Sequence, residues 1–173
     1  MRIVAGAHKG RQLAAPKGGD VRPTSARARE ALFNLLEHGK LAADGSPIAG
    51  AHVLDAFAGS GANGLEALSR GAAHVTFMDN NRAALDALRR NVAELGVQRQ
   101  TTVVPADVRA PPTARHACDL AVLDPPYARG LASPALTALA AAGWLAPGAL
   151  VCVEMAKTDD VEPVAGLTPL EAR

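Results

Sequence analysis

The sequence has little cysteine, almost no excess of one charge sign and no unbroken apolar run. Its two cysteines, Cys118 and Cys152, have no second Cys and no His at ligand spacing, which leaves neither a disulfide framework nor a zinc site to propose. Glycines and prolines interrupt the charge-poor stretch 130–155, so we expect no spanning helix there. The N-terminus has no signal-peptide pattern. We therefore expect a soluble, cytoplasmic protein.

What the chain has is enough length and apolar content for a buried core. It has 173 residues, of which 49% are hydrophobic and 20% are charged, which suits one globular domain. The 18 Lys and Arg nearly balance the 17 Asp and Glu, but their distribution is uneven. Residues 1–40 hold eight basic and three acidic residues, whereas the other 133 residues hold ten basic and fourteen acidic ones. A basic end of this kind is typical of a segment that binds a polyanion.

The basic end has its own predicted organisation. Two short apolar runs within residues 2–14, separated by a turn at Gly10, predict a small hairpin. Apolar residues at helical spacing then predict a helix from Thr24 or Ser25 to Gly39. A connector with Gly, Pro and Ser follows, and we divide the chain there. The division gives a basic extension at 1–40, a connector at 40–50 and a main domain at 51–173.

The main domain alternates between short apolar runs and helical periodicity. The predicted strands are 52–57, 73–78, 101–104, 119–123 and 149–153, and the predicted helices are 62–70, 81–95 and 134–142. Strands that alternate with helices predict an α/β fold. We expect an open, mainly parallel sheet with right-handed crossovers and helices on both faces.

A glycine-rich turn, Gly59 to Gly64, follows the first of these strands and opens the next helix. Glycines let a backbone turn tightly and approach a ligand, and a helix N-terminus offers free N–H groups. Taken alone, the pattern fits equally well a turn that binds nothing. Asp79 ends the second strand 20 residues after Gly59, where a carboxylate can accept hydrogen bonds from both hydroxyls of a ribose.

Asp55, four residues before the first glycine, narrows the choice of ligand. Nicotinamide and flavin dinucleotides use the same turn geometry, so a dehydrogenase remains an alternative. An acid at this position would repel a pyrophosphate and could instead hold the ammonium of an amino-acid moiety. A carboxylate that only caps the amide groups of the loop is an equal alternative.

The segment Asp124-Pro125-Pro126-Tyr127 follows the apolar run 120–123 and stands at the carboxyl end of a predicted strand, where open α/β sheets bind ligands. Two prolines stiffen the loop. The Asp124 carboxylate and the Pro125 carbonyl can accept the two hydrogens of a nucleobase amine, and Tyr127 offers a ring on which the base can stack. The structural alternative is a proline-stiffened turn with a capping aspartate.

These residues carry a resemblance. The chain from Asp55 to Tyr127 resembles the class I S-adenosylmethionine-dependent methyltransferases, and Asp-Pro-Pro-Tyr resembles the signature of amino-methyltransferases. The blocks 2–11, 22–34 and 55–72 look like the bacterial RsmD family. The resemblance implies a Rossmann-like fold and S-adenosylmethionine as cofactor, with S-adenosylhomocysteine as product. It also implies methylation of the N2 amine of one guanine in 16S ribosomal RNA.

The resemblance also implies roles for individual residues. Asp79 would bind the ribose, and Asp107 would accept from the adenine amine. The implied cofactor-binding residues are Asp55, Phe57, Gly59, Gly61, Gly64, Asp79, Asn80 and Asp107. The implied catalytic residues, which hold the guanine, are Asp124, Pro125, Pro126 and Tyr127. The implied RNA-binding residues are Arg2, Lys9, Arg11, Arg22, Thr24, Arg27 and Arg29, although for each basic residue alone a solvated surface charge is the commoner outcome.

The expected reaction is an in-line displacement in which the guanine amine attacks the methyl group, without a metal. The expected partner is 16S ribosomal RNA in the small subunit or an assembly intermediate, and we expect a monomer with no membrane contact. The family pattern continues beyond residue 173 into a final antiparallel strand pair, which this chain is expected to lack. The alternatives are an adenine-N6 methyltransferase acting on DNA or RNA and a non-catalytic RNA-binding assembly factor.

Overall fold

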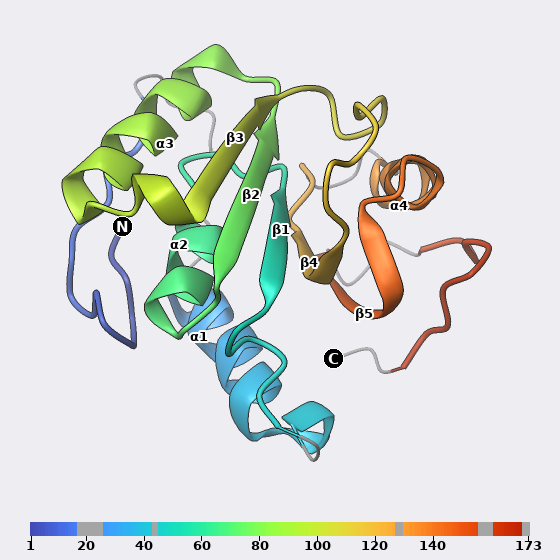
Figure 1. The fold of residues 1–173 in the computed structure, drawn as a ribbon, viewed down its shortest axis with the longest axis horizontal. Helices are drawn as coiled ribbons and strands as arrows, with labels where there is room; N and C mark the ends of the chain where they lie inside the picture. Colours follow the sequence, from blue (N-terminus) through green and yellow to red (C-terminus); the bar gives the residue numbers. More distant parts are fainter. Residues whose placement is uncertain (17–25, 43–44, 127–129, 156–160, 171–173) are drawn as a thin grey trace.

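In the part of the chain that the structure describes, five strands form one parallel sheet in the order β3-β2-β1-β4-β5 (Figure 1). The computed structural model describes residues 1–16, 26–42, 45–126, 130–155 and 161–170. The strands are β1 (His52–Ala56), β2 (His74–Asp79), β3 (Thr101–Pro105), β4 (Cys118–Leu123) and β5 (Leu145–Val153). Each neighbouring pair runs parallel. The expected open α/β sheet is confirmed.

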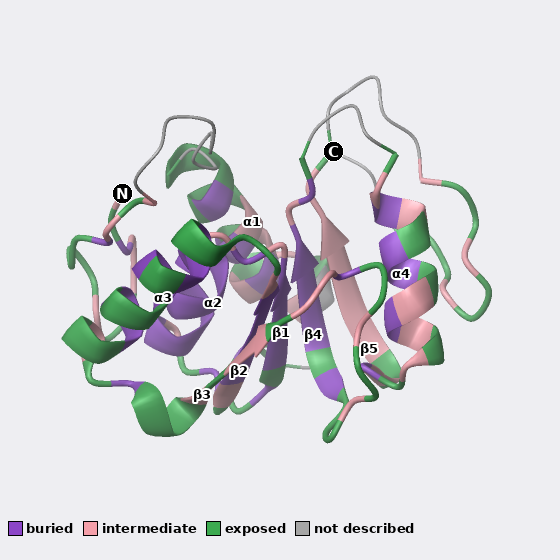
Figure 2. Cartoon of the chain, turned by 90° about the horizontal axis from the view of Figure 1, so that it is seen from above, coloured by how far each residue is buried: buried purple, intermediate pink, exposed green. Residues whose placement is uncertain are grey.

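Helices cover both faces of this sheet (Figure 2). The α-helices are α1 (Ala26–His38), α2 (Ala62–Ser69), α3 (Arg82–Leu95) and α4 (Ala132–Ala141), and the 3-10 turns are η1 (Lys40–Ala42) and η2 (Gln98–Gln100). Buried residues of α1, α2 and α3 share one core cluster, and those of α4 belong to a second cluster on the opposite face. No helix in these described ranges is long and apolar enough to cross a membrane.

Helix α3 forms where the sequence predicts it because its ends are encoded locally. The side chain of Asn81 accepts a hydrogen bond from Ala84 N at 3.1 Å and caps the N-terminus. Gly96 ends the helix with a φ of 72°, which favours glycine. Between them, Leu85 and Leu88 face the core.

The last predicted strand begins earlier than expected. The predicted strand starts at Ala149, but β5 already begins at Leu145 and includes Pro147 and Gly148. It lies at the edge of the described sheet, where proline and glycine are tolerated. The pairing between β4 and β5 shifts register between Cys118 and Leu120.

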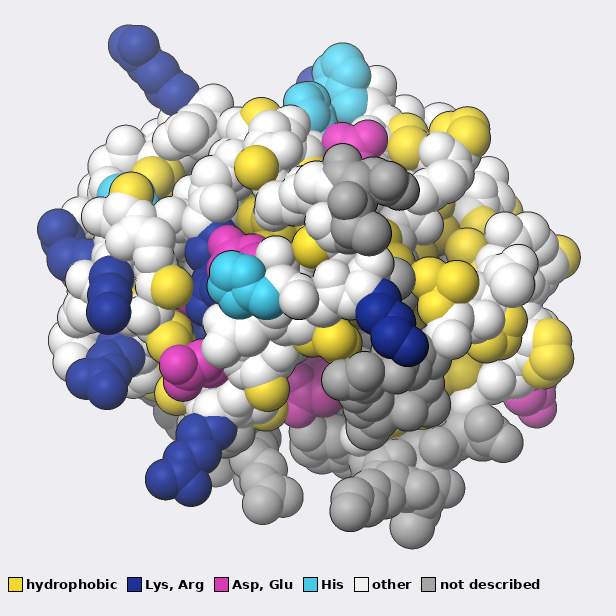
Figure 3. Space-filling model, turned by 90° about the horizontal axis from the view of Figure 1, so that it is seen from below, with side chains coloured by type: hydrophobic (Ala, Val, Ile, Leu, Met, Phe, Trp, Pro, Cys, Tyr) yellow, Lys and Arg dark blue, Asp and Glu magenta, His cyan; other side chains and the backbone are white. Residues whose placement is uncertain are grey.

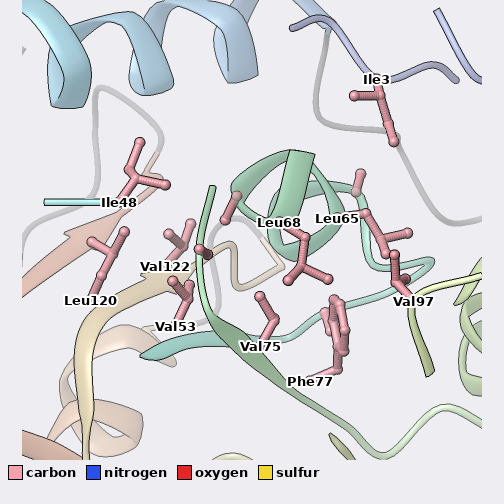
Figure 4. Packing of buried hydrophobic residues seen from close by; sticks show 14 of the residues in the cluster. Ile3, Ile48, Val53, Leu65, Leu68, Val75, Phe77, Val97, Leu120 and Val122 are labelled. Atoms are coloured by element: carbon pink, nitrogen blue, oxygen red, sulfur yellow. The ribbon is translucent and has the colours of Figure 1, made fainter. Parts of the chain in front are cut away.

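The N-terminal segment, residues 1–16, packs into the same core as the main sheet (Figure 4). Ile3 and Leu13 belong to the cluster that contains Val53, Leu65 and the other residues shown there. The expected hairpin is reduced to one antiparallel bridge between residues 2 and 12. The reason is that backbone groups of this segment bond to α2 and α3 as well as to each other.

Candidate functional site

Three aspartates meet at the carboxyl edge of the sheet. Asp55 is the fourth residue of β1, Asp79 is the last residue of β2, and Asp124 directly follows β4. These strands are neighbours in the order β2-β1-β4. Asp124 N also donates a long hydrogen bond of 3.4 Å to the carbonyl of Ala56. The glycine turn and the proline loop therefore begin at one edge, as the order of motifs predicted.

Hydrogen bonds fix the glycine turn against β2. Gly59 N donates to Asp79 Oδ2 at 2.8 Å, and Gly61 N donates to the Ala58 carbonyl at 2.7 Å. Phe57, at the start of the turn, has a φ of 60° and is the one non-glycine residue with positive φ in the described part of the chain. Such a backbone is strained for an aromatic residue, and strain of this kind is found at ligand sites.

The three glycines of the turn serve different purposes. A Cβ atom on Gly64 would lie 2.3 Å from Phe77 Cε1, and one on Gly61 would lie 2.3 Å from Leu88 Cδ1. These two glycines let α2 pack closely on β2 and α3. A Cβ atom on Gly59 would meet nothing within 4 Å. Of these three glycines, only Gly59 therefore borders open space in which a ligand could lie.

Asp55 caps α2 with one oxygen and leaves the other without a partner. Its Oδ2 accepts from Gly64 N at 2.8 Å, whereas its Oδ1 is buried and unpartnered. Burial raises the pKa of Asp55 well above its usual value, and the charges of Asp124 and Asp79 raise it further. The Gly64 hydrogen bond and the Arg29 charge lower it. Capping and ligand contact are thus compatible at this residue.

Asn63 is a candidate that the sequence reasoning missed. It precedes Gly64 in the first turn of α2, its residue is 6% exposed, and its Oδ1 has no hydrogen-bond partner. A buried amide oxygen without a partner is costly unless a ligand or water satisfies it. The available signal was an amide side chain inside a glycine-rich turn.

Asp79 holds the turn and the start of α3 together. In addition to the bond from Gly59, its Oδ1 accepts from Asn81 N at 2.7 Å. A carboxylate has about four acceptor positions, so both oxygens retain capacity for hydroxyl donors. Asn80, which stands between Asp79 and Asn81 in the sequence, is exposed.

Asp107 lies near Asp79 because Ala106 N donates to the Asp79 carbonyl at 3.1 Å. Its carboxylate accepts from the Arg109 side chain at 2.6 and 3.0 Å and from Arg109 N at 2.9 Å. These bonds hold the pKa of Asp107 below its usual value. The group is therefore an ionised acceptor at the same edge.

The proline loop is only partly described. Asp124 is half-buried, Pro125 is buried and Pro126 is exposed. Tyr127 lies outside the described residues, as do Arg22 and Thr24 in the basic extension. The other surface candidates, Arg2, Lys9, Arg11 and Arg27, are exposed.

The expected contact of Arg29 with phosphate is wrong. Arg29 is 1% exposed because it lies on the buried face of α1, together with Phe33 and Leu36. Its Nη2 donates to the Arg2 carbonyl at 2.6 Å, and its Nε lies 3.7 Å from Glu66 Oε2. Arg29 thus holds the N-terminal segment in place from inside the protein.

Glu66 is the centre of this buried network, which the sequence did not indicate. Its carboxylate accepts from Val4 N at 2.8 Å, Ala5 N at 3.0 Å and Arg70 Nε at 2.8 Å. Arg70 Nη1 in turn lies 2.5 Å from Glu37 Oε2. The network fastens the N-terminal segment to the helix that begins at the glycine turn.

Comparison with known proteins agrees with this fold. A family model described as "Conserved hypothetical protein 95" matches residues 1–171. The "Ribosomal RNA small subunit methyltransferase D" of Escherichia coli is 40% identical over 156 residues, covering 89% of this chain and 74% of that protein. The Haemophilus influenzae protein of the same name is 35% identical over 161 residues, covering 91% and 79%.

The similarity extends to a solved structure. A structure described as "Putative methyltransferase yhhF from Escherichia coli" is 37% identical, with a TM-score of 0.77 over 96% of this chain and 86% of that chain. Sequence and fold therefore agree along nearly the whole length. The chain belongs to the Conserved hypothetical protein 95 family, the RsmD family of Rossmann-like class I methyltransferases.

Proposed function

We propose that this protein transfers a methyl group from S-adenosylmethionine to the exocyclic N2 of a guanine in 16S ribosomal RNA of the small subunit. The observation that carries the proposal is the common edge at which Asp55, Asp79 and Asp124 meet. The relatives named ribosomal RNA small subunit methyltransferase D support the class of substrate.

The residues at this edge fit the proposed cofactor. S-Adenosylmethionine carries three groups of hydrogen-bond donors in a row: the adenine amine, the ribose hydroxyls and the ammonium of its methionine end. Acceptors stand in the same order along the sheet, with Asp107 after β3, Asp79 on β2 and Asp55 on β1. The unpartnered oxygens of Asp55 and Asn63 would receive the ammonium, and Gly59 leaves room for the chain of the ligand.

This order places the methionine end beside β4, where the base would bind. When bound, the cofactor supplies a methyl group activated by a positively charged sulfur. Asp124 and the Pro125 carbonyl would each accept one hydrogen of the guanine amine and so orient its nitrogen lone pair. Asp124 would then accept or relay the proton that the nitrogen loses on methylation. Because a stacked guanine is inaccessible, the base must be flipped out or lie in a loop.

The exposed basic residues of the N-terminal segment would contact the RNA backbone. Arg2, Lys9 and Arg11 are exposed, and residues 1–16 contain no acidic side chain. Such contacts set the position of a protein on RNA without reading its sequence. The buried network around Glu66 would keep this segment at a fixed place relative to the glycine turn.

The test is to map methylated nucleotides in ribosomal RNA from cells with and without this protein. We expect mass spectrometry of digested RNA to show one N2-methylguanine of the small subunit that disappears without the protein. Transfer of a labelled methyl group by the purified protein to small subunits from the deficient cells would place the activity in this chain. N6-methyladenine as the product, or RNA that is unchanged between the two strains, would contradict the proposal.

A further inference from the structure

The outer face of α3 is an arginine-rich surface that the site described above does not use. Arg82, Arg89 and Arg90 are exposed, while the opposite face of the helix packs into the core. Arg89 lies 3.3 Å from Asp86, with both side chains more than half exposed. Exposed pairs of this kind contribute little to stability.

The N-terminal segment lies directly beside this face. Ala14 exchanges two hydrogen bonds with the Asn91 side chain, at 2.7 and 3.1 Å. Arg11 Nη2 donates to the Glu94 carbonyl at 2.9 Å. Since Arg90 directly precedes Asn91 and stands one turn before Glu94, the two segments form one surface. We call Arg11, Arg82, Arg89 and Arg90 the basic strip.

Charge is concentrated around the basic strip. Residues 1–16 and 81–100 together contain seven Lys or Arg and two Asp or Glu. The rest of the chain contains eleven Lys or Arg and fifteen Asp or Glu. The two acids, Asp86 and Glu94, both lie on α3. Figure 3 shows Lys and Arg side chains gathered on the half of the molecule that carries the N-terminal segment and α3.

The helix dipole does not favour the arginine at the start of α3. Arg82 is the first residue of α3, where the helix dipole disfavours a positive charge, and the first turn contains no acid. The last turn, where a basic residue would be favourable, has none. The helix dipole therefore does not explain the positive charge at the start of α3.

We propose that the basic strip binds the sugar-phosphate backbone of the RNA substrate. This inference rests on the proposed function and extends the RNA contact from the N-terminal segment along α3. Arg82 stands three residues after Asp79, so the strip begins at the reaction edge. From there to Glu94 the helix rises about 18 Å, the length of several nucleotides. An electropositive strip of this length suits an RNA backbone and carries no base-reading geometry.

The experiment measures RNA affinity of the full chain as a function of salt. The probe is a fluorescently labelled transcript of 16S ribosomal RNA, and the variant is Arg90→Gln, which keeps helix propensity. The matched control is Arg115→Gln, which removes one exposed charge from the loop before β4. We expect Arg90→Gln to weaken RNA binding about threefold to tenfold. The salt slope, which is the fall of log affinity with log salt concentration, should decrease by about one. Both effects should be equal for a scrambled RNA. Arg115→Gln should leave the slope unchanged.

The possible outcomes separate this inference from the proposed function. A salt slope for Arg90→Gln equal to that of the wild type would overturn the basic strip, whatever the methylation result. Weakened binding to assembled subunits but not to the transcript would also overturn it, because the contact would then be to protein. Wild-type protein that binds RNA through the strip but transfers no methyl group would reject the proposed function alone.

Discussion

The Oδ2 atom of Asp55 accepts a hydrogen bond from Gly64 N at 2.8 Å, which ties the end of β1 to the first turn of α2. The bond joins residues that are nine positions apart in the sequence and so closes the loop of chain that contains the glycine turn. Because the other oxygen is buried without a partner, the same side chain is a structural cap and an open acceptor.

The Asp55→Asn variant should change how stability depends on pH. Burial raises the Asp55 pKa in the folded state, so the folded protein keeps this proton at pH values where the unfolded chain has lost it. The free energy of unfolding therefore falls as pH rises from the ordinary aspartate pKa through the raised one. Asn removes this contribution. Thermal denaturation of both free proteins between about pH 5 and pH 8 checks it, and parallel curves would contradict the assignment.

Replacing two glycines of the turn should separate packing from ligand contact. Gly64→Ala places a methyl group against Phe77 and Val75 and should cost about 1–3 kcal/mol of stability by overpacking. Gly59→Ala meets no neighbouring atom but strains the backbone at a φ of 56°, which should cost about 1–2 kcal/mol of stability. It should also weaken binding of S-adenosylhomocysteine about tenfold, or about 1.4 kcal/mol. Calorimetric titration of the folded fraction distinguishes them. Equal loss of affinity in both variants would show that Gly59 has no special role.

Asp124→Asn should abolish most methyl transfer while leaving cofactor binding nearly intact. Loss of the charged acceptor at the amine should reduce kcat about a hundredfold or more. The matched control is Asp119→Asn, an exposed acid five residues earlier on β4 whose carboxylate accepts from His52 N at the opposite end of the sheet. Single-turnover assays on small subunits measure the difference. Similar rates of methyl transfer for the two variants would show that Asp124 takes no part in the reaction.

Arg29→Met should destabilise the protein without removing a cation from the RNA-facing surface. It removes a buried cation that faces Glu66 and the Arg2 carbonyl, and breaking a buried ionic network typically costs about 3–5 kcal/mol. The salt slope of RNA binding by the folded protein should stay at the wild-type value because Arg29 is inside the protein. Denaturant titration and RNA binding give the two readings. If the variant kept the wild-type free energy of unfolding but showed a smaller salt slope, Arg29 would have to contact the RNA.

Both cysteines should be unreactive in the folded protein. Burial raises the pKa of the Cys118 thiol to about 12 and that of Cys152 to about 11, so almost no thiolate exists at neutral pH. A thiol reagent should label the buried Cys118 only as fast as the protein unfolds, and should label the half-buried Cys152 slowly because its thiolate is scarce. Rapid labelling of one site under native conditions would show that its strand opens locally.

Local signals in the sequence account for most of the correct predictions. Helix α3 was predictable because Asn81, Gly96 and the leucine spacing all act within one segment. The position of Asp124 at a strand end followed from the apolar run before it and from the alternation of strands and helices. The start of β5 was not predictable, because Pro147 and Gly148 are tolerated only at an edge that pairing defines.

The sequence by itself determined the order of strands and helices, the acids and glycines at strand ends, and the basic excess of the N-terminal segment. Only the tertiary structure decided that Arg29 points inward, that Gly61 and Gly64 serve packing, and that the arginines of α3 border the N-terminal segment. The physical reason is range. Capping and periodicity act over a few residues, whereas burial, steric room and shared charge depend on segments that are separate in the sequence and that folding brings together, as with Arg11 and Glu94, 83 residues apart.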